Sequence, residues 1–396
     1  MNHLRYRQGN DDPLPGPTVY RLASERRYGE IPIHVQANPQ DIYWADRYGS
    51  TALHILCCSR QVGDPLWRAI DSILSRDPRL VRRPNEASWT PLHLACEKRL
   101  LWRTNVATGD LVLKLIDACP EAVTMRLQTG YKAKTPFHIA CETNADIRVL
   151  RAILRVAPSL ATQSYYKKDS GDRTRHTKVN ETALELLWNA QLKDQRPSSL
   201  EESLAKMEPL LRAAFCGTIM DGDTFASGPF PIVCAACHVR CPRAYLSHIL
   251  TIHSRNIAIP NPETGLLPLH YAILSADEAD QTAYTGTLIE WLVEEYPQAA
   301  LVPFRPGSHV MPLHVLIVDR GMTWHKGGVQ PLALAATEVL TIADPRSGLV
   351  PALESAIYAY LSRIHLSTTY ELLRLAPEVL QSGFASAGYA SDGNGQ

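Results

Sequence analysis

The residues between Cys234 and His253 are the first whose types and spacing suggest chemistry. Cys234 and Cys237 form a Cys-x2-Cys pair. Ten residues separate this pair from His248, and four more separate His248 from His253. Two thiolates and two imidazoles can bind zinc tetrahedrally, although such fingers normally have about twelve central residues. The other interpretation assigns the cysteines to a small-residue helix and the histidines to the next helix. It needs no metal, so we expect none and keep the zinc site as an alternative.

Five other histidines recur along the chain in a similar local sequence. The first three, His54, His93 and His138, are 39 and then 45 residues apart. Catalysis would require a carboxylate or nucleophile at a fixed place beside each of them. No such neighbour recurs, so we expect all five to be structural. The full set is His54, His93, His138, His270 and His314.

A third candidate is the basic loop 165–178, in which two tyrosines precede a run of cations. Tyr165 and Tyr166 are followed directly by Lys167 and Lys168. Aromatic and cationic side chains together favour docking of an acidic peptide, a phosphate or RNA. The other interpretation is a solvated loop, because charge runs ordinarily face water. The same choice applies to three arginines on the preceding helix, Arg148, Arg151 and Arg155.

Composition excludes several classes of protein. Forty basic residues balance forty acidic ones, so nucleic acid and anionic membranes are not expected partners. No run of 18 apolar residues predicts a membrane helix, and the first residues lack an apolar signal segment. The nine cysteines lie mostly in apolar stretches, which indicates reduced thiols in an intracellular protein, cytoplasmic or nuclear.

Sequence motifs for catalysis are also missing. The chain has no Gly-Lys-Ser/Thr phosphate loop, no Gly-x-Gly-x-x-Gly, no His-Glu-x-x-His and no Gly-x-Ser-x-Gly. We therefore expect a protein that is not an enzyme, needs no cofactor and takes no small-molecule substrate. A monomer with a protein partner is the expected form.

The elements that position these residues begin at a four-residue box, which reads Thr-Pro-Leu-His at Thr90–His93. Threonine is a good N-cap, and proline suits the first helical position, where its missing N–H has no partner to lose. A second signature is an amphipathic helix that ends at a proline such as Pro78 or Pro120, because proline cannot continue a helix. The box residues are Thr51, His54, Thr90, Pro91, His93, Thr135, Pro136, His138, Pro268, His270, Pro312 and His314.

A Thr-Pro-Leu-His box followed by a small-residue helix resembles the ankyrin repeat. The resemblance implies an all-α solenoid of about seven or eight repeats with degenerate ends. It implies that each box histidine ties its turn together by hydrogen bonds, and that a concave surface binds a partner protein. The proline that ends each second helix departs from the family, in which glycine is more familiar there.

The repeat pattern also predicts domain boundaries. We expect one solenoid over 19–381 between disordered tails at 1–18 and 382–396. Its expected parts are a degenerate first repeat (19–46), the best-defined repeats (47–163), a basic insertion (164–180), degenerate repeats (181–259), two further repeats (260–319), an insertion (320–346) and a C-terminal capping repeat (347–381).

The residues expected to bind a partner follow the box on the first helix or lie in projecting loops. Arginine, tryptophan and tyrosine are the residue types that most often dominate binding energy. The alternative function is a zinc- or nucleic-acid-binding module built from Cys234–His253 and the basic loop. The partner-binding candidates are Glu97, Lys98, Arg99, Trp102, Glu142, Thr143, Arg82, Arg83, Trp89, Tyr131 and Lys132, with Arg47 and Tyr48 as further loop residues.

Overall fold

The protein is described here by a computed structural model of residues 17–380, which leaves out 60, 62, 98–106, 128–132, 168–178, 194–199, 218–229, 240, 277–282, 306, 309 and 363–365. The chain divides into two compact units, unit 1 (Met1–Ile219) and unit 2 (Met220–Gln396). Helices dominate both units, which confirms the all-α class. Across the described residues, no helix combines the length and the apolar run needed to span a bilayer.

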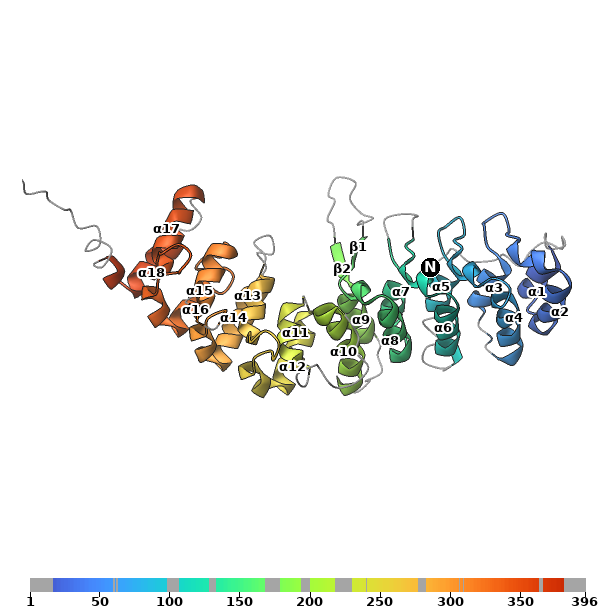
Figure 1. Ribbon diagram of the computed structural model, residues 1–396, viewed down its shortest axis with the longest axis horizontal. Coiled ribbons are helices and arrows are strands. Elements are labelled where there is room, and N and C mark those ends of the chain that lie inside the picture. Colours follow the sequence, from blue (N-terminus) through green and yellow to red (C-terminus); the bar gives the residue numbers. More distant parts are fainter. Residues whose placement is uncertain are drawn as a thin grey trace, which may run out of the picture. The chain divides into compact units, whose positions relative to one another are not determined.

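Unit 1 consists of helix pairs followed by short 3-10 helices (Figure 1). The first helices α1, α3, α5, α7 and α9 pack side by side, as do α2 with α4 and α6 with α8 with α10. The bounds are α1 (Thr18–Ser24), η1 (Tyr28–Glu30), α2 (Ile31–Ala37), η2 (Pro39–Tyr43), α3 (Ala52–Cys58), α4 (Asp64–Leu74), η3 (Pro78–Arg82), α5 (Pro91–Cys96), α6 (Ala107–Ala118), η4 (Pro120–Thr124), α7 (Pro136–Glu142), α8 (Ile147–Val156), η5 (Pro158–Ala161), α9 (Ala183–Leu192) and α10 (Leu200–Cys216).

A short antiparallel strand pair interrupts the helices of unit 1. Strand β1 (Ser164–Lys167) pairs with β2 (Val179–Thr182), and Ser164 lies opposite Thr182. The expected insertion at 164–180 therefore begins and ends in a ladder. The rest of the basic loop, 168–178, lies outside the described residues.

Unit 2 repeats the same order of elements, and α11 packs on α13 and α14 on α16. The segment 320–346, expected to be an insertion, instead contains the second helix of a repeat, α16, and its 3-10 helix. The bounds are α11 (Ile232–His238), α12 (Arg243–Ile252), η6 (Ser254–Ala258), α13 (Pro268–Ser275), α14 (Ala283–Glu295), η7 (Pro297–Leu301), α15 (Pro312–His314), a π-helical turn η8 (Val315–Asp319), α16 (Val329–Ala335), η9 (Thr337–Thr341), α17 (Pro351–Ser362) and α18 (Leu366–Leu375).

The prolines that follow α2, α4, α6, α8 and α14 each begin a 3-10 helix. The residue before the proline lies outside the helical region, with φ −150° and ψ 99° at Asp77 and φ −143° and ψ 78° at Ala157. A following proline disfavours the helical conformation at this residue. The 3-10 helix then buries its third and fourth residues, such as Leu80 and Val81 in η3. The proline is thus a packing element as well as a stop.

The first helices form the centre of each core. All six residues of α5 are buried, and Ala95 and Cys96 are fully covered. Small side chains at these two positions let α3 and α7 approach α5 from both sides. All nine cysteines are free thiols.

Candidate protein-interaction surface

At the start of α3, α5 and α7, the box threonine and histidine form a reciprocal cap. At α5, the backbone N–H of Thr90 donates to His93 Nδ1 (3.3 Å), and the N–H of His93 donates to Thr90 Oγ1 (3.3 Å). The same arrangement occurs at Thr135 and His138. Two backbone donors that the helix itself cannot satisfy therefore have partners.

The other ring nitrogen of each box histidine connects one repeat to the next. His54 Nε2 lies 3.1 Å from the carbonyl oxygen of Trp89, and His93 Nε2 lies 3.4 Å from that of Lys134. A carbonyl can only accept and Nδ1 already accepts, so Nε2 carries the proton. The remaining pairs have the same form: His138 with Gln163 (3.0 Å), His270 with Val302 (2.9 Å) and His314 with Ile342 (2.9 Å).

Burial keeps the box histidines neutral. It lowers the pKa of His54, His93 and His138 to about 4 in each case, against the opposing effect of their carbonyl partners. Burial also lowers the pKa of His270 and His314. With both ring nitrogens bound to backbone, these side chains hold the scaffold together and are not available for proton transfer.

The loops that project between repeats are fixed by polar turns. Asp46 Oδ1 accepts hydrogen bonds from the backbone N–H groups of Tyr48 (2.9 Å) and Ser50 (2.8 Å). In the next loop, Asn85 Oδ1 accepts from the N–H of Trp89 (2.9 Å). The two loops are joined, because the N–H of Glu86 donates to the Tyr48 carbonyl (2.9 Å). Hydrogen bonds within and between the two loops therefore fix their conformation.

Exposed side chains at the tip of the first of these loops can contact a partner. Arg47 and Tyr48 are both exposed, and the Arg47 guanidinium carbon lies 4.8 Å from the centre of the Tyr48 ring. This cation–π contact holds an arginine and a tyrosine together at the surface.

Three predicted binding residues in the loop region already have contacts within the protein. Arg82 is exposed and forms an ion pair with Glu121 of the next repeat. Arg83 is half-buried and donates to the Tyr43 carbonyl (2.7 Å). The half-buried Trp89 ring meets the His93 ring edge-on at 6.1 Å. All three stabilise the scaffold, and Arg82 is the most exposed of them.

The candidates at the ends of first helices separate into exposed and buried side chains. Glu97 and Glu142 are exposed at the ends of α5 and α7, and Glu142 pairs with Lys134. The placement of Thr143 on a binding surface is wrong, because Thr143 is only 8% exposed. Its hydroxyl donates to the Cys96 carbonyl (3.0 Å), so it joins α7 to α5. The remaining candidates, Lys98, Arg99, Trp102, Tyr131 and Lys132, lie outside the described residues.

The cysteines and histidines of the alternative zinc site do not assemble into one. Within the described part of the chain, no group of three or more potential ligands is close enough to hold a metal ion. Burial raises the pKa of Cys234 to about 12 and that of Cys237 well above its ordinary value. Cys234 and Cys237 lie in the core on α11, whereas His248 is exposed on α12. The repeat position explains these residues without metal.

One of the arginines of α8 connects this helix to the neighbouring second helix. Arg148 forms ion pairs with Asp146 and, across to α6, with Asp110 (3.1 Å). Arg151 and Arg155 are exposed. The pair with Asp110 shows that charges on second helices connect neighbouring repeats in unit 1.

Sequence reasoning missed the division of charge between the two units. Unit 1 has 31 basic against 24 acidic residues, and unit 2 has 9 basic against 16 acidic residues. The formal charges are therefore +7 and −7, which cancel over the whole chain. Counting charges separately on either side of residue 220 would have found this signal.

Comparison with known protein families finds no match, and neither does comparison with curated proteins. Among solved structures, a chain in the complex of the Bd0816 predatory endopeptidase from Bdellovibrio bacteriovorus with immunity protein Bd3460 is similar to part of this protein. The similarity covers 50% of this chain and 98% of that chain, with 16% identity and a TM-score of 0.33. A similarity of this size carries no argument, so we argue function from the residues.

Proposed function

We propose that the protein is a non-catalytic interaction scaffold of the ankyrin type, in which stacked helix pairs present preformed loops to a partner protein. The observation that carries the proposal is the connection of each box histidine to the backbone of the following repeat. A loop held in this way loses little conformational entropy on binding. The proposal rests on the residues alone and applies first to the loop side of unit 1.

Arg47 and Tyr48 are the residues that we assign to the partner contact. They are exposed, they touch each other, and their types are those most often found at the centre of interfaces. Glu97 and Glu142, which are exposed at the ends of α5 and α7, are further candidates. The expected partner is a protein whose surface carries acidic side chains for Arg47 and an apolar side chain for the Tyr48 ring.

Binding by the full-length chain tests this function. The bait is tagged wild-type protein, and the captured protein is identified and then titrated against the purified chain. The double variant Arg47→Glu with Tyr48→Ala should weaken that binding about tenfold or more, because the variant loses the ring contact and reverses one charge.

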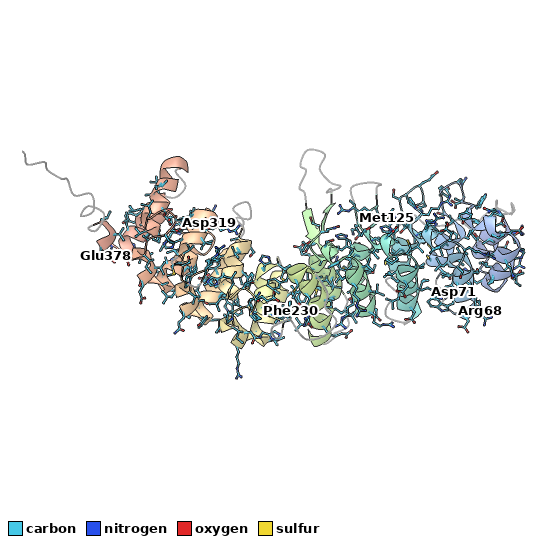
Figure 2. The ribbon with its side chains drawn as sticks, in the orientation of Figure 1. Arg68, Asp71, Met125, Phe230, Asp319 and Glu378 are labelled. Atoms are coloured by element: carbon cyan, nitrogen blue, oxygen red, sulfur yellow. The ribbon has the colours of Figure 1, made fainter. Side chains whose placement is uncertain are left out.

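A matched control changes the same residue types away from the loops. Arg68 lies on α4, and Figure 2 shows it on the opposite side of unit 1 from Met125, which follows η4 at the start of a loop. Tyr370 is 66% exposed on α18. Arg68→Glu with Tyr370→Ala should leave binding within about twofold. If both double variants bind equally well, the loop side of unit 1 is not the contact surface.

A further inference from the structure

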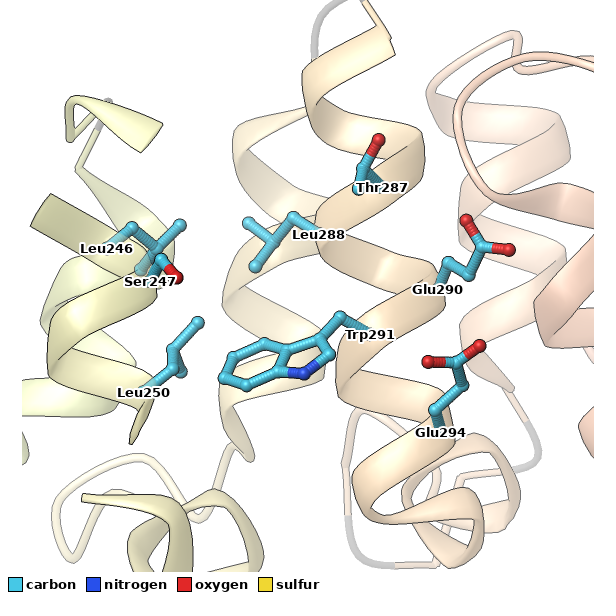
Figure 3. Close-up of a pocket in the computed structure, with 8 residues that line it drawn as sticks. All are labelled: Leu246, Ser247, Leu250, Thr287, Leu288, Glu290, Trp291 and Glu294. Atoms are coloured by element: carbon cyan, nitrogen blue, oxygen red, sulfur yellow. The ribbon is translucent and has the colours of Figure 1, made fainter. Parts of the chain in front are cut away.

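Two second helices of unit 2, α12 and α14, have an apolar groove between them. Its volume is about 430 Å3, and Leu246 and Leu250 of α12 face Leu288 and Trp291 of α14 across it (Figure 3). The three leucines are buried, but Trp291 is only half-buried. We call this site, with Glu290 and Glu294, which also line it, the Trp291 groove.

Negative charge on α14 accompanies the groove. Figure 3 shows Glu290 and Glu294 on the side of α14 away from Leu246. Both are exposed, and like charges four residues apart on a helix repel. Glu294 and Glu295 also occupy the last turn, which has no basic residue and where the helix dipole favours cations. Among the described residues, none of these three glutamates forms an ion pair.

The corresponding surface of unit 1 shows which kind of side chain pairs with a carboxylate on a second helix. Asp71 of α4 forms an ion pair with Lys114 of α6, whose ammonium also lies 5.4 Å from the centre of the Trp67 ring. Asp71 stands seven residues before the proline that ends its helix, and Lys114 stands six residues before its own. An aromatic ring, a carboxylate and a lysine thus form one contact between repeats.

In unit 2 the same two positions hold Glu290 and Trp291, seven and six residues before Pro297. By the same count, the residue of α16 that corresponds to Lys114 stands six residues before η9, and it is Pro331. The residue of α12 that corresponds to Asp71 stands seven residues before η6, and it is Ser247, which lines the groove. Trp291 therefore occupies the position that Lys114 has in unit 1, and the chain supplies no cation at either of the two facing positions.

We propose that the Trp291 groove binds a basic amphipathic peptide segment of another protein. An apolar side chain of the peptide lies between Leu246, Leu250 and Trp291, and its lysines or arginines pair with Glu290 and Glu294. The charge of −7 on unit 2 attracts such a segment. This surface consists of second helices, so the inference is independent of the loop surface in unit 1.

A synthetic peptide provides the probe. We suggest a fluorescent peptide of about 15 residues, with leucines on one helical face and lysines on the other, titrated with the full chain by anisotropy. A second peptide has glutamate in place of every lysine. The lysine peptide should bind with a Kd in the micromolar range, and the glutamate peptide should bind at least about tenfold more weakly.

Variants locate the binding. Glu290→Gln with Glu294→Gln should weaken the lysine peptide about tenfold, and Trp291→Ala should have a similar effect. The matched control removes two other exposed carboxylates of unit 2, Glu338→Gln with Glu378→Gln, and should stay within about twofold. The glutamine variants change only exposed side chains, so they report on the groove even if Trp291→Ala is poorly folded.

Three results would overturn the proposal. The first is an equal loss in the Glu338/Glu378 control, which would indicate general attraction to unit 2. The second is unchanged binding by the Glu290/Glu294 variant, which would place the peptide elsewhere. The third is a wild-type dimer by sedimentation that Trp291→Ala converts to a monomer, because a second copy of the chain would then occupy the groove.

Discussion

Each box histidine makes one contact within its own repeat and one with the next, so its contribution to stability depends on both ring nitrogens. His93 caps α5 through Nδ1 and donates to the Lys134 carbonyl through Nε2. At the fourth box, which begins at Thr182 before α9, glutamate replaces histidine, and Glu185 Oε2 accepts from the N–H of Thr182 (2.7 Å). An ionised carboxylate has no proton to donate. Glu185 therefore caps α9 but does not donate a hydrogen bond to the following repeat.

Removing one of these side chains should be costly. His93→Ala leaves the buried Thr90 N–H and Lys134 carbonyl without their partner, which should lower the free energy of unfolding by about 2–4 kcal/mol. Urea titration followed by circular dichroism measures the change. Glu86→Ala, at an exposed loop position, should change it by less than about 0.5 kcal/mol. A similar small change at His93 would mean that the connecting bond does not stabilise the scaffold.

Acid should destabilise the protein through the same residues. The folded protein keeps His54, His93 and His138 neutral down to about pH 4, whereas unfolded histidine takes up a proton near pH 6.5. Between these values the unfolded state binds more protons, so stability falls as pH falls. Thermal melts from pH 7 to pH 4 should show this decline, and the His93→Ala variant should decline less steeply. A Tm that stays constant to pH 4.5 would contradict the assignment.

At the scale of elements, the box and the proline were sufficient to predict most helices. The second helices predicted before Pro78 and Pro120, for example, are α4 and α6. The segment 320–346 was misread, because α16 is only seven residues long and follows two glycines that resemble a loop. Thr143 was misplaced because sequence does not reveal that its hydroxyl reaches Cys96. The Trp291 groove needs the spacing of α12 and α14, which no local pattern gives.

The approach of α14 to the loop before α16 explains the second of these glycines, Gly328. Gly328 has φ +86°, and a Cβ there would lie 2.7 Å from the Ile289 Cβ on α14. Gly307 has a similar φ of +76° but open space around it. Both positions favour glycine for their backbone, but only Gly328 is also limited by packing.

This contrast gives a paired prediction. Gly307→Ala should destabilise the protein by about 1 kcal/mol, which is the backbone cost alone. Gly328→Ala should cost about 2 kcal/mol more, because α14 must shift to admit the methyl group. Urea titrations of both variants measure the difference. Equal losses would show that the contact between α14 and the loop can relax freely.

At the scale of the whole molecule, two compact units of opposite charge lie on one chain. Each contains its own core of buried first helices. We expect the units to unfold in separate transitions, because a compact unit with its own core can unfold as one cooperative whole.

Calorimetry of two matched variants tests this independence. His93→Ala should lower the Tm of one transition and His270→Ala that of the other, because each removes the same kind of bond from a different unit. A shift of about 5–10 °C is expected for the affected unit. Movement of both transitions by either variant would show that the chain unfolds as a whole.

The length of chain enclosed by the histidine bonds has a consequence for synthesis on the ribosome. His54 and Trp89 are 35 residues apart, and His93 and Lys134 are 41 residues apart. Contacts between residues that are close in sequence form quickly, and repeats can be added one after another to those already folded. Each bond can therefore close as soon as the next loop has left the exit tunnel. The growing chain needs to keep only about one repeat unfolded at a time, which limits the apolar surface exposed to aggregation.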